Sequence, residues 1–332
     1  MKKTILFLFF AIALSQQVHA QTDSIRTYIM EALSLMKTRS VNKATVNWDK
    51  VYTEAFNAAS NLKSVRATYP IIKAALANLN DAHSKFFPPE MVQAYLLGYR
   101  ATGQQFPVID TNFLNKQYAY ISLPAIASYN FNDWNEYVST FYLKVAQLQT
   151  QQPKGWIIDL RDNDGGMFYP MYAALSVFTD QQKVIGVKDG EGKLIYFGYK
   201  NGKLYEQKKI MHRFKLAKIK LKKIKQPIVV LINKRTASSG EFAAISFAGQ
   251  KNITIIGENT AGLTSANQEH KLKDGAFLVL TEGNTIDRNG KEYAKIGEGL
   301  IPDLKIENLP SAKNDELYFK KAIDILNKVK RK

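Results

Sequence analysis

The sequence predicts an α/β protein in which a small helical region precedes the strands. Residues 155–160, 227–232 and 253–257 are near-continuous apolar runs, as in strands that are covered on both faces. Segments with helical periodicity lie between these runs, and buried strands that alternate with helices are typical of an α/β core. With 332 residues and 45% hydrophobic content, the chain can bury such a core without disulfides, for which it has no cysteine.

The first twenty residues predict a secretory signal peptide. Two lysines are followed by an apolar run over residues 5–14, and Val18-His19-Ala20 offers a cleavage site before Gln21. Ten apolar residues are too few to cross about 30 Å of hydrocarbon. We therefore expect an exported protein, periplasmic or secreted, with no integral membrane segment after cleavage.

The next segment is helical in pattern. Apolar residues recur at helical spacing through residues 24–80, and Pro88-Pro89 then interrupts the pattern. We predict a helical subdomain over residues 21–90 and an α/β domain over residues 91–332.

The α/β region contains further periodic segments. Besides the three apolar runs, we expect strands at 118–123 and 277–281, short strands within 184–207, and helices at 134–148, from about 167, from about 241 and at 315–329.

A basic run between Lys200 and Lys225 accounts for much of the net charge of +17. Such a run can bind nucleic acid or an anionic membrane surface. Its lysines alternate with Leu216, Ile219 and Leu221, which favours a solvated face of packed secondary structure. An exported protein rarely meets nucleic acid, so we expect no nucleic-acid partner; a basic surface-binding protein remains the third interpretation.

The segment Thr236-Ala237-Ser238-Ser239-Gly240-Glu241 follows an apolar strand and begins a helix. Small residues allow a sharp turn there, which exposes the Ser238 hydroxyl and leaves backbone N–H groups free to stabilise an oxyanion. The alternative is an ordinary capping box made by Ser238 and Glu241.

A second polar turn, Asp159-Leu160-Arg161-Asp162-Asn163-Asp164-Gly165-Gly166, follows another strand. Its two glycines permit backbone conformations that are closed to other residues and a close approach to a ligand. It is either a simple turn or the source of backbone donors for the serine turn.

A general base would have to come from elsewhere. Three histidines follow the signal, and His83 stands in a polar turn between Asp81 and Ser84. Histidine suits the role because its pKa lies near neutrality. His212 and His270 have no comparable setting. We expect no metal and no organic cofactor, since the sequence has no histidine cluster and no phosphate-binding glycine loop.

The order of these motifs resembles the tail-specific (C-terminal-processing) protease family of serine peptidases. The resemblance rests on several blocks that cover nearly the whole mature chain: Asp81-Ala82-His83-Ser84 with Pro88-Pro89-Glu90, the 159–166 turn, Asn233 to Glu241, Gly257-Glu258-Asn259-Thr260-Ala261-Gly262, and Gly299-Leu300-Ile301-Pro302-Asp303.

The resemblance implies a spiral core related to crotonase and ClpP, with Ser238 as nucleophile. It also implies an oxyanion hole from the N–H groups of Ser239 and of Gly165 or Gly166. Well-known members use a lysine base at the position that Leu263 occupies here, so a Ser–Lys dyad is impossible at that place.

Tricorn-type relatives instead use a histidine from the early Asp-x-His-Ser region, which corresponds to His83. In those relatives a glutamate before the final Pro-Asp assists the histidine. The ungapped match is Ile296, so Glu298 is the candidate for the third catalytic residue and Glu282 the alternative.

Only about 33 residues separate Ser84 from Tyr118, too few for the PDZ domain that many relatives carry there. Recognition of free C-terminal tails through a PDZ groove is therefore not expected. We expect an endopeptidase that acts on unfolded or flexible polypeptide segments, because a recessed nucleophile admits only extended chain. The alternative is a catalytically inactive peptide- or ligand-binding protein on the same fold, because fold does not fix function.

Overall fold

The computed structural model describes residues 23–295, 297–306 and 311–329, and the predicted signal peptide lies outside them. The chain divides into two compact units. One comprises the chain up to Gln93 together with Asn267–Glu282; the other comprises Ala94–Ala266 and the chain from Gly283 onward. The domain boundary predicted at residue 90 stays a prediction. In the described residues, no helix is long and apolar enough to cross a membrane.

The first unit contains the predicted helical region. Its elements are a helix over residues 23–39, η1 (Lys43–Thr45), α2 (Trp48–Ala59), η2 (Val65–Thr68), α3 (Tyr69–Ala77) and the strand β1 (Lys85–Phe87). The helices share a core with the apolar side chains of residues 272–280, and β1 pairs with Phe277 to Val279 at the start of β12 (Phe277–Asp287). A distant hairpin segment therefore completes this unit.

The second unit is built on a six-stranded sheet in the order β14-β10-β9-β4-β3-β2. The strands are β2 (Thr111–Leu114), β3 (Tyr118–Ser122), β4 (Gly155–Asp159), β9 (Ile228–Ile232), β10 (Ile253–Gly257) and β14 (Leu304–Lys305). All neighbours are parallel except β2, which runs antiparallel to β3.

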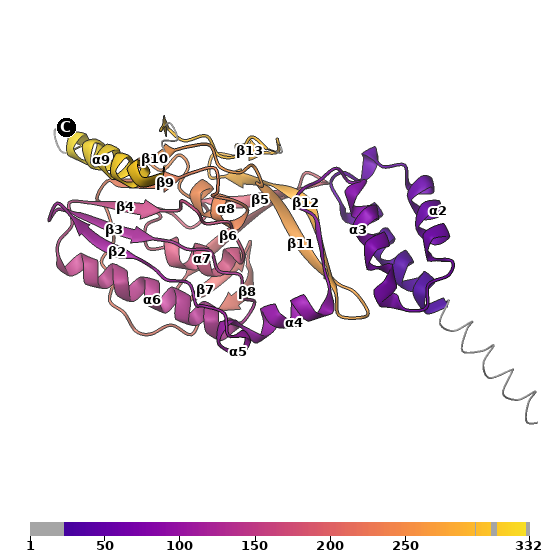
Figure 1. Cartoon of the computed structure of the whole chain (residues 1–332). Helices are drawn as coiled ribbons and strands as arrows, with labels where there is room; N and C mark the ends of the chain where they lie inside the picture. Colours follow the sequence, from indigo (N-terminus) through magenta and orange to yellow (C-terminus); the bar gives the residue numbers. More distant parts are fainter. Residues whose placement is uncertain (1–22, 296, 307–310, 330–332) are drawn as a thin grey trace, which may run out of the picture. The chain divides into compact units, whose positions relative to one another are not determined.

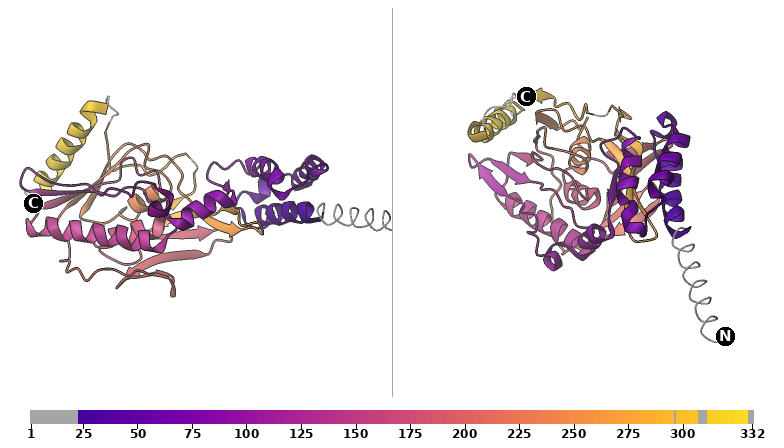
Figure 2. Two further views of the ribbon diagram at one scale, coloured as in Figure 1. Left: turned by 60° about the horizontal axis from the view of Figure 1, so that its bottom comes forward. Right: turned by 45° about the vertical axis from the view of Figure 1, so that its right-hand side comes forward.

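Helices cover both faces of this sheet, as Figures 1 and 2 show. Three helices pack with Ile228, Val230 and Ile232 on one face: α6 (Phe131–Thr150), α7 (Phe168–Leu175) and α8 (Ser239–Ile245). On the other face, Val229 and Leu231 pack against α9 (Ser311–Val329). Burial on both faces explains why β4 and β9 read as continuous apolar runs.

A second, antiparallel set of strands belongs to the same unit. The later half of β12 pairs with β5 (Ile185–Asp189), and the pairing continues through β6 (Leu194–Lys200), β7 (Lys203–Glu206) and β8 (Lys209–Arg213). The remaining elements are α4 (Pro89–Leu97), which crosses the boundary between the units, α5 (Tyr99–Thr102), β11 (Ser265–Lys271) and β13 (Glu292–Tyr293).

The predicted α/β class and the N-terminal helical region are confirmed. The interpretation of the basic run needs one correction. Only its first part is regular, in β6, β7 and β8, and residues 214–225 form neither helix nor strand. Their apolar side chains still pack on the core, which explains why the alternation suggested a packed element.

Candidate active site

Ser238 lies in a strained turn between β9 and α8. It is the N-cap of α8, with φ 51° and ψ −121°. A positive φ at a non-glycine residue costs on the order of 1–3 kcal/mol and persists only where surrounding contacts enforce it. Its neighbours Ala237 and Ser239 are buried, whereas Ser238 itself is partly exposed. The turn therefore presents a serine at the surface of an otherwise buried segment.

The double-glycine turn lies directly against this serine. A Cβ built on Gly165 (φ 110°) would come within 2.9 Å of the Ser238 Cβ, and one on Gly166 (φ 95°) within 2.2 Å of the Ile126 carbonyl oxygen. The Ser239 hydroxyl donates to the Gly166 carbonyl over 2.7 Å. Two turns that are separated by about 70 residues in the sequence are thus in contact, as the sequence suggested.

Asn163 joins the two turns. Its side-chain Nδ2 donates to the Leu123 carbonyl over 2.8 Å, and its Oδ1 accepts from the Gly165 N–H over 3.1 Å. Its backbone carbonyl accepts from the Ala237 N–H over 2.9 Å. Asn163 is only 1% exposed. Nothing in the sequence distinguishes Asn163 from the other polar residues of this turn, because its role depends on contacts with distant segments.

At the contact between the two turns, two backbone amides have no acceptor among the residues that the structure describes. These are the N–H groups of Ser239 and Gly166, which follow the serine and the first glycine. The Gly165 N–H, by contrast, is used by Asn163. Of the two glycines that the sequence left open as oxyanion donors, Gly166 is the one whose amide is available.

Glu241 holds the serine turn from within α8. Its carboxylate accepts from the Ser238 N–H over 2.9 Å, which is the carboxylate half of the expected capping box. It also accepts from the N–H groups of Gly262 and Leu263, over 2.9 and 2.7 Å. Leu263 therefore reaches the serine turn through its backbone, at the position where relatives carry a lysine side chain.

His83 belongs to the first unit and Ser238 to the second. His83 is 6% exposed, in a turn whose backbone has one local and one distant partner. Its N–H donates to Asp81 Oδ1 over 2.8 Å, and its carbonyl accepts from Asn267 Nδ2 over 3.0 Å. Ser84 donates its hydroxyl to the other Asp81 oxygen. Asp81 thus shapes the His83 turn through the backbone.

The two candidate glutamates have different surroundings. Glu282 pairs with His270 Nε2 and with Arg39, whose guanidinium lies 3.1 Å away. Burial works to raise the pKa of Glu282, but the hydrogen bonds and positive charges of His270 and Arg39 outweigh it and lower the pKa. Glu298 is partly exposed and forms an ion pair with Lys295 over 3.3 Å.

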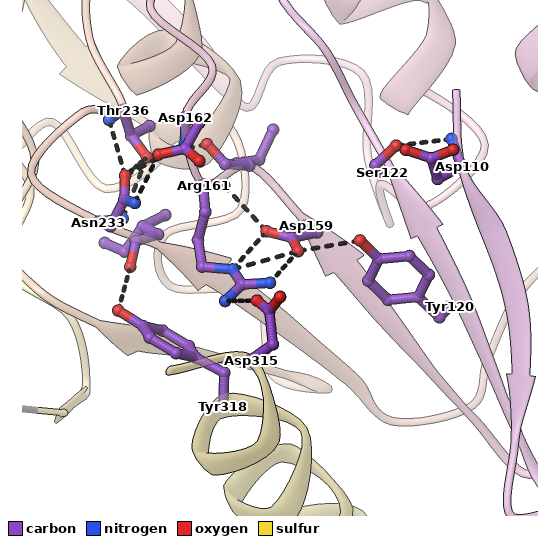
Figure 3. Close-up of polar contacts among 12 residues, drawn as sticks. Asp110, Tyr120, Ser122, Asp159, Arg161, Asp162, Asn233, Thr236, Asp315 and Tyr318 are labelled. Carbon is purple, nitrogen blue, oxygen red and sulfur yellow. Dashed lines mark hydrogen bonds and ion pairs between the residues drawn. The ribbon is translucent and has the colours of Figure 1, made fainter. Parts of the chain in front are cut away.

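The start of the polar turn serves a structural purpose (Figure 3). Arg161 contacts the Asp159 carboxylate over 2.6 Å and Asp315 of α9 over 2.8 Å, and it stacks on the Tyr318 ring with 4.5 Å to the centroid. The Tyr120 hydroxyl donates to Asp159 over 3.0 Å. These contacts tie the ends of β3 and β4 to α9.

Comparison with known proteins places this geometry in a family. Residues 117–306, more than half of the chain, match peptidase family S41. The chain is 27% identical to a nisin-resistance protein of Lactococcus lactis subsp. lactis, over 89% of this chain and 87% of that one. It is 28% identical to the carboxy-terminal processing protease CtpA of Bacillus subtilis, over 52% of this chain but only 34% of that protein.

Solved structures show the same fold. A lipoprotein from Streptococcus agalactiae superposes with a TM-score of 0.70 at 24% identity, over 90% of this chain and 96% of that one. The photosystem II D1 C-terminal processing protease superposes with a TM-score of 0.59 at 16% identity, over 86% and 93% of the two chains. The family resemblance drawn from the motifs is confirmed: the chain belongs to peptidase family S41 and is a serine peptidase.

Proposed function

We propose that this chain is an exported endopeptidase that cuts unfolded or flexible polypeptide segments, with Ser238 as nucleophile and His83 as base. The observation that carries the proposal is the strained, partly exposed Ser238 held against Gly165 next to two available amides. Enzymes retain this kind of strain where it preorganises a reacting group. A purely structural turn has no need of it.

The reaction proceeds by acyl transfer. Ser238 Oγ attacks the scissile carbonyl carbon while His83 takes its proton, and the N–H groups of Ser239 and Gly166 stabilise the oxyanion. Collapse breaks the C–N bond, and His83 returns the proton to the leaving amine. Water then attacks the acyl-enzyme with His83 again as base, which releases the carboxylic acid and restores Ser238.

For the third catalytic residue we propose Glu298 rather than Glu282. Both oxygens of Glu282 are already engaged by His270 and Arg39. Glu298 has a partly exposed carboxylate whose ion pair with Lys295 is also accessible to solvent, so it can exchange partners at little cost.

The test is cleavage of an unstructured protein such as denatured casein by the chain from Gln21 onward, together with labelling by a fluorophosphonate probe. We expect Ser238→Ala to abolish both cleavage and labelling, and His83→Ala to lower both at least about 1,000-fold. Matched controls are Ser246→Ala, whose hydroxyl bonds within α8, and His212→Phe, in an aromatic cluster. Nisin is a further substrate to include, because of the name of the Lactococcus relative.

A folded parent that neither cuts nor labels would overturn the proposal and favour a binding protein on the same fold. Cleavage that survives His83→Ala would overturn the assignment of the base alone. Two single substitutions then compare the candidates for the third catalytic residue: Glu298→Gln should lower kcat more than Glu282→Gln.

A further inference from the structure

Glu241 carries a contact pattern that an ordinary helix cap does not need. Its side chain is completely buried. Oε2 accepts from the N–H groups of Ser238 and Leu263, and Oε1 accepts from the Gly262 N–H and the Thr260 hydroxyl. Thr260 Oγ1 in turn accepts from the Leu300 N–H over 2.7 Å. One carboxylate thereby connects the nucleophile to the 260–263 loop and to the segment beyond Gly299.

Three of the four partners of Glu241 are backbone N–H groups, which can only donate, and the fourth is the Thr260 hydroxyl. An ionised carboxylate accepts from all four, whereas the amide group of a glutamine would direct its N–H donors at one pair of them. No ion pair to Glu241 is present within the described ranges, so these four dipoles alone compensate its charge. Burial raises the pKa of this carboxyl, and hydrogen bonds from Thr260, Gly262, Ser238 and Leu263 oppose the rise.

We propose that Glu241 is a positioning residue that holds Ser238 in its strained conformation by tying the serine turn to residues 260–263. The inference rests on the proposed function of Ser238. Glu241 fixes the Ser238 N–H and so the direction of the next peptide, which carries the Ser239 amide of the oxyanion hole. The loop that supplies a lysine side chain in relatives supplies backbone support here.

The test is Glu241→Gln, which keeps the shape of the side chain but can accept from one pair of donors only. We expect kcat to fall about 100-fold, the size of effect that follows a small misplacement of reacting groups, with KM within about twofold of the parent. The rate of fluorophosphonate labelling at Ser238 should fall in parallel. Glu292→Gln is the matched control, a surface carboxylate paired with Lys188 over 2.8 Å.

The outcomes separate the two claims. A folded Glu241→Gln variant with parental kcat and labelling would overturn the positioning role, as would a change in KM alone. A parent that does not label would overturn the proposed function and this role with it. If Glu241→Gln does not fold, Thr260→Val removes one donor and leaves the carboxylate; we expect a smaller loss of kcat and of labelling, and no loss would refute the role.

The segment Arg213–Lys225, which we name the basic strap, is strongly basic. It carries seven cations and no acidic residue, and all seven are exposed: Arg213, Lys215, Lys218, Lys220, Lys222, Lys223 and Lys225. None of them forms an ion pair with a residue that the structure describes. The charge of the strap is therefore uncompensated.

The strap is held in place although it has no regular structure. Phe214 and Ile224 are buried in the core, and Leu216, Ile219 and Leu221 pack against it. The Lys215 N–H donates to Asn135 Oδ1 over 2.8 Å, and Gln149 bonds both the N–H and the carbonyl of Lys222, over 2.9 and 2.8 Å. Asn135 and Gln149 both belong to α6, so the strap follows this helix with its apolar residues inward and its cations outward.

We infer that the basic strap binds the surface of membranes that contain anionic phospholipids. A row of outward cations on one side of a fixed segment fits a plane of phosphate headgroups, which attracts lysine and arginine near its surface. Surfaces that bind single-stranded nucleic acid combine cations with aromatic residues for stacking. The residues between the cations here are mostly aliphatic and turned into the core, which favours lipid.

The test is cosedimentation of the chain from Gln21 onward with vesicles of phosphatidylcholine alone or with about one third phosphatidylglycerol. We expect binding to the anionic vesicles only, weakened by salt because exposed charges are screened. The variant Lys218→Gln, Lys220→Gln, Lys222→Gln, Lys223→Gln should bind at least about 10-fold more weakly. A control with equal net charge changes four scattered exposed lysines: Lys73, Lys116, Lys251 and Lys320.

The control variant should bind within about twofold of the parent. Equal losses in the two variants would show that net charge alone acts and would overturn the role of the strap. Absence of vesicle binding by the parent would also overturn it, and strap-dependent binding to DNA in its place would assign the surface to a nucleic acid.

Discussion

The turns of Ser238 and His83 are built in different ways. The Ser238 turn is strained, and residues far away in the sequence hold it: Asn163, Gly165, Leu263 and, through Glu241, Thr260. The His83 turn also has distant partners, Asn267 and Thr281, but its conformation is that of an Asx turn in which the Asp81 carboxylate two residues earlier accepts from the histidine N–H. Long-range contacts can enforce a costly backbone conformation at one point, whereas a local Asx turn adopts a favourable one by itself. Changes at the serine turn should therefore have the larger effects.

Among changes that leave the Ser238 and His83 side chains in place, the largest effect is expected for Gly165→Ala. The new Cβ would lie 2.9 Å from the Ser238 Cβ and 3.0 Å from the Ala237 carbonyl, so the serine turn must shift. We expect kcat to fall at least about 100-fold. Gly192→Ala is the control, because it also has a positive φ but nothing within 4 Å of its Cβ. Comparable losses in the two variants would mean that backbone strain, rather than contact with Ser238, is the cause.

A somewhat smaller effect is expected for Asn163→Ala. Loss of the side chain leaves the Leu123 carbonyl and the Gly165 N–H without their buried partner. An unsatisfied buried polar group costs about 1–3 kcal/mol, so the free energy of unfolding should fall by about 2–4 kcal/mol. Urea denaturation measures this loss. Asn163→Ala also frees the Gly165 N–H. If this amide then binds the oxyanion, activity will fall less than the loss of stability alone predicts.

Asp81→Ala tests the local turn. It removes the acceptor of the His83 N–H and of the Ser84 hydroxyl. We expect a loss of about 1 kcal/mol in the free energy of unfolding, as for other local caps, and a fall in kcat of about 10-fold. Asp81→Asn retains one acceptor and should recover most of both. An effect on kcat as large as that of Gly165→Ala would erase the contrast between the two turns.

The smallest effect is expected for Arg39→Gln, in the unit that contains His83. The native pKa of Glu282 is lowered, so its ionised form contributes stability that is present above the unfolded pKa and is lost as the pH falls through the native pKa. The window lies below about pH 4.5, the ordinary range of a glutamate. Arg39 is half exposed, so its removal should cost only about 0.5–1 kcal/mol at neutral pH and flatten the acid limb. Unfolding curves between pH 3 and 7 measure the loss of stability at neutral pH and the decrease of stability in acid. If Arg39→Gln leaves the decrease in acid unchanged, the lowered pKa of Glu282 is due to His270 alone.

Much of the site was predicted where a local pattern had a single physical meaning. The apolar runs gave β4, β9 and β10 nearly to the residue, because strands buried on both faces need apolar side chains at every position. The contact between the turns at Gly165 and Ser238 was also expected. The roles of Asn163 and Thr260, and the contacts of Glu241 beyond its capping box with Ser238, were not, since each is an ordinary polar residue until the chain segments it connects are brought together.

By itself, the sequence determined the α/β class, the N-terminal helical region, the peptidase family and the position of the serine turn. These depend on periodicity and on motifs in a fixed order, which are local properties. Only the tertiary structure decided that Gly166 rather than Gly165 has an available amide, that Glu282 is engaged by His270 and Arg39, and that the basic strap lacks regular structure. The tertiary contacts decide which hydrogen-bond donor pairs with which acceptor, because the two atoms often come from distant parts of the chain. A local sequence pattern contains no information about such pairs.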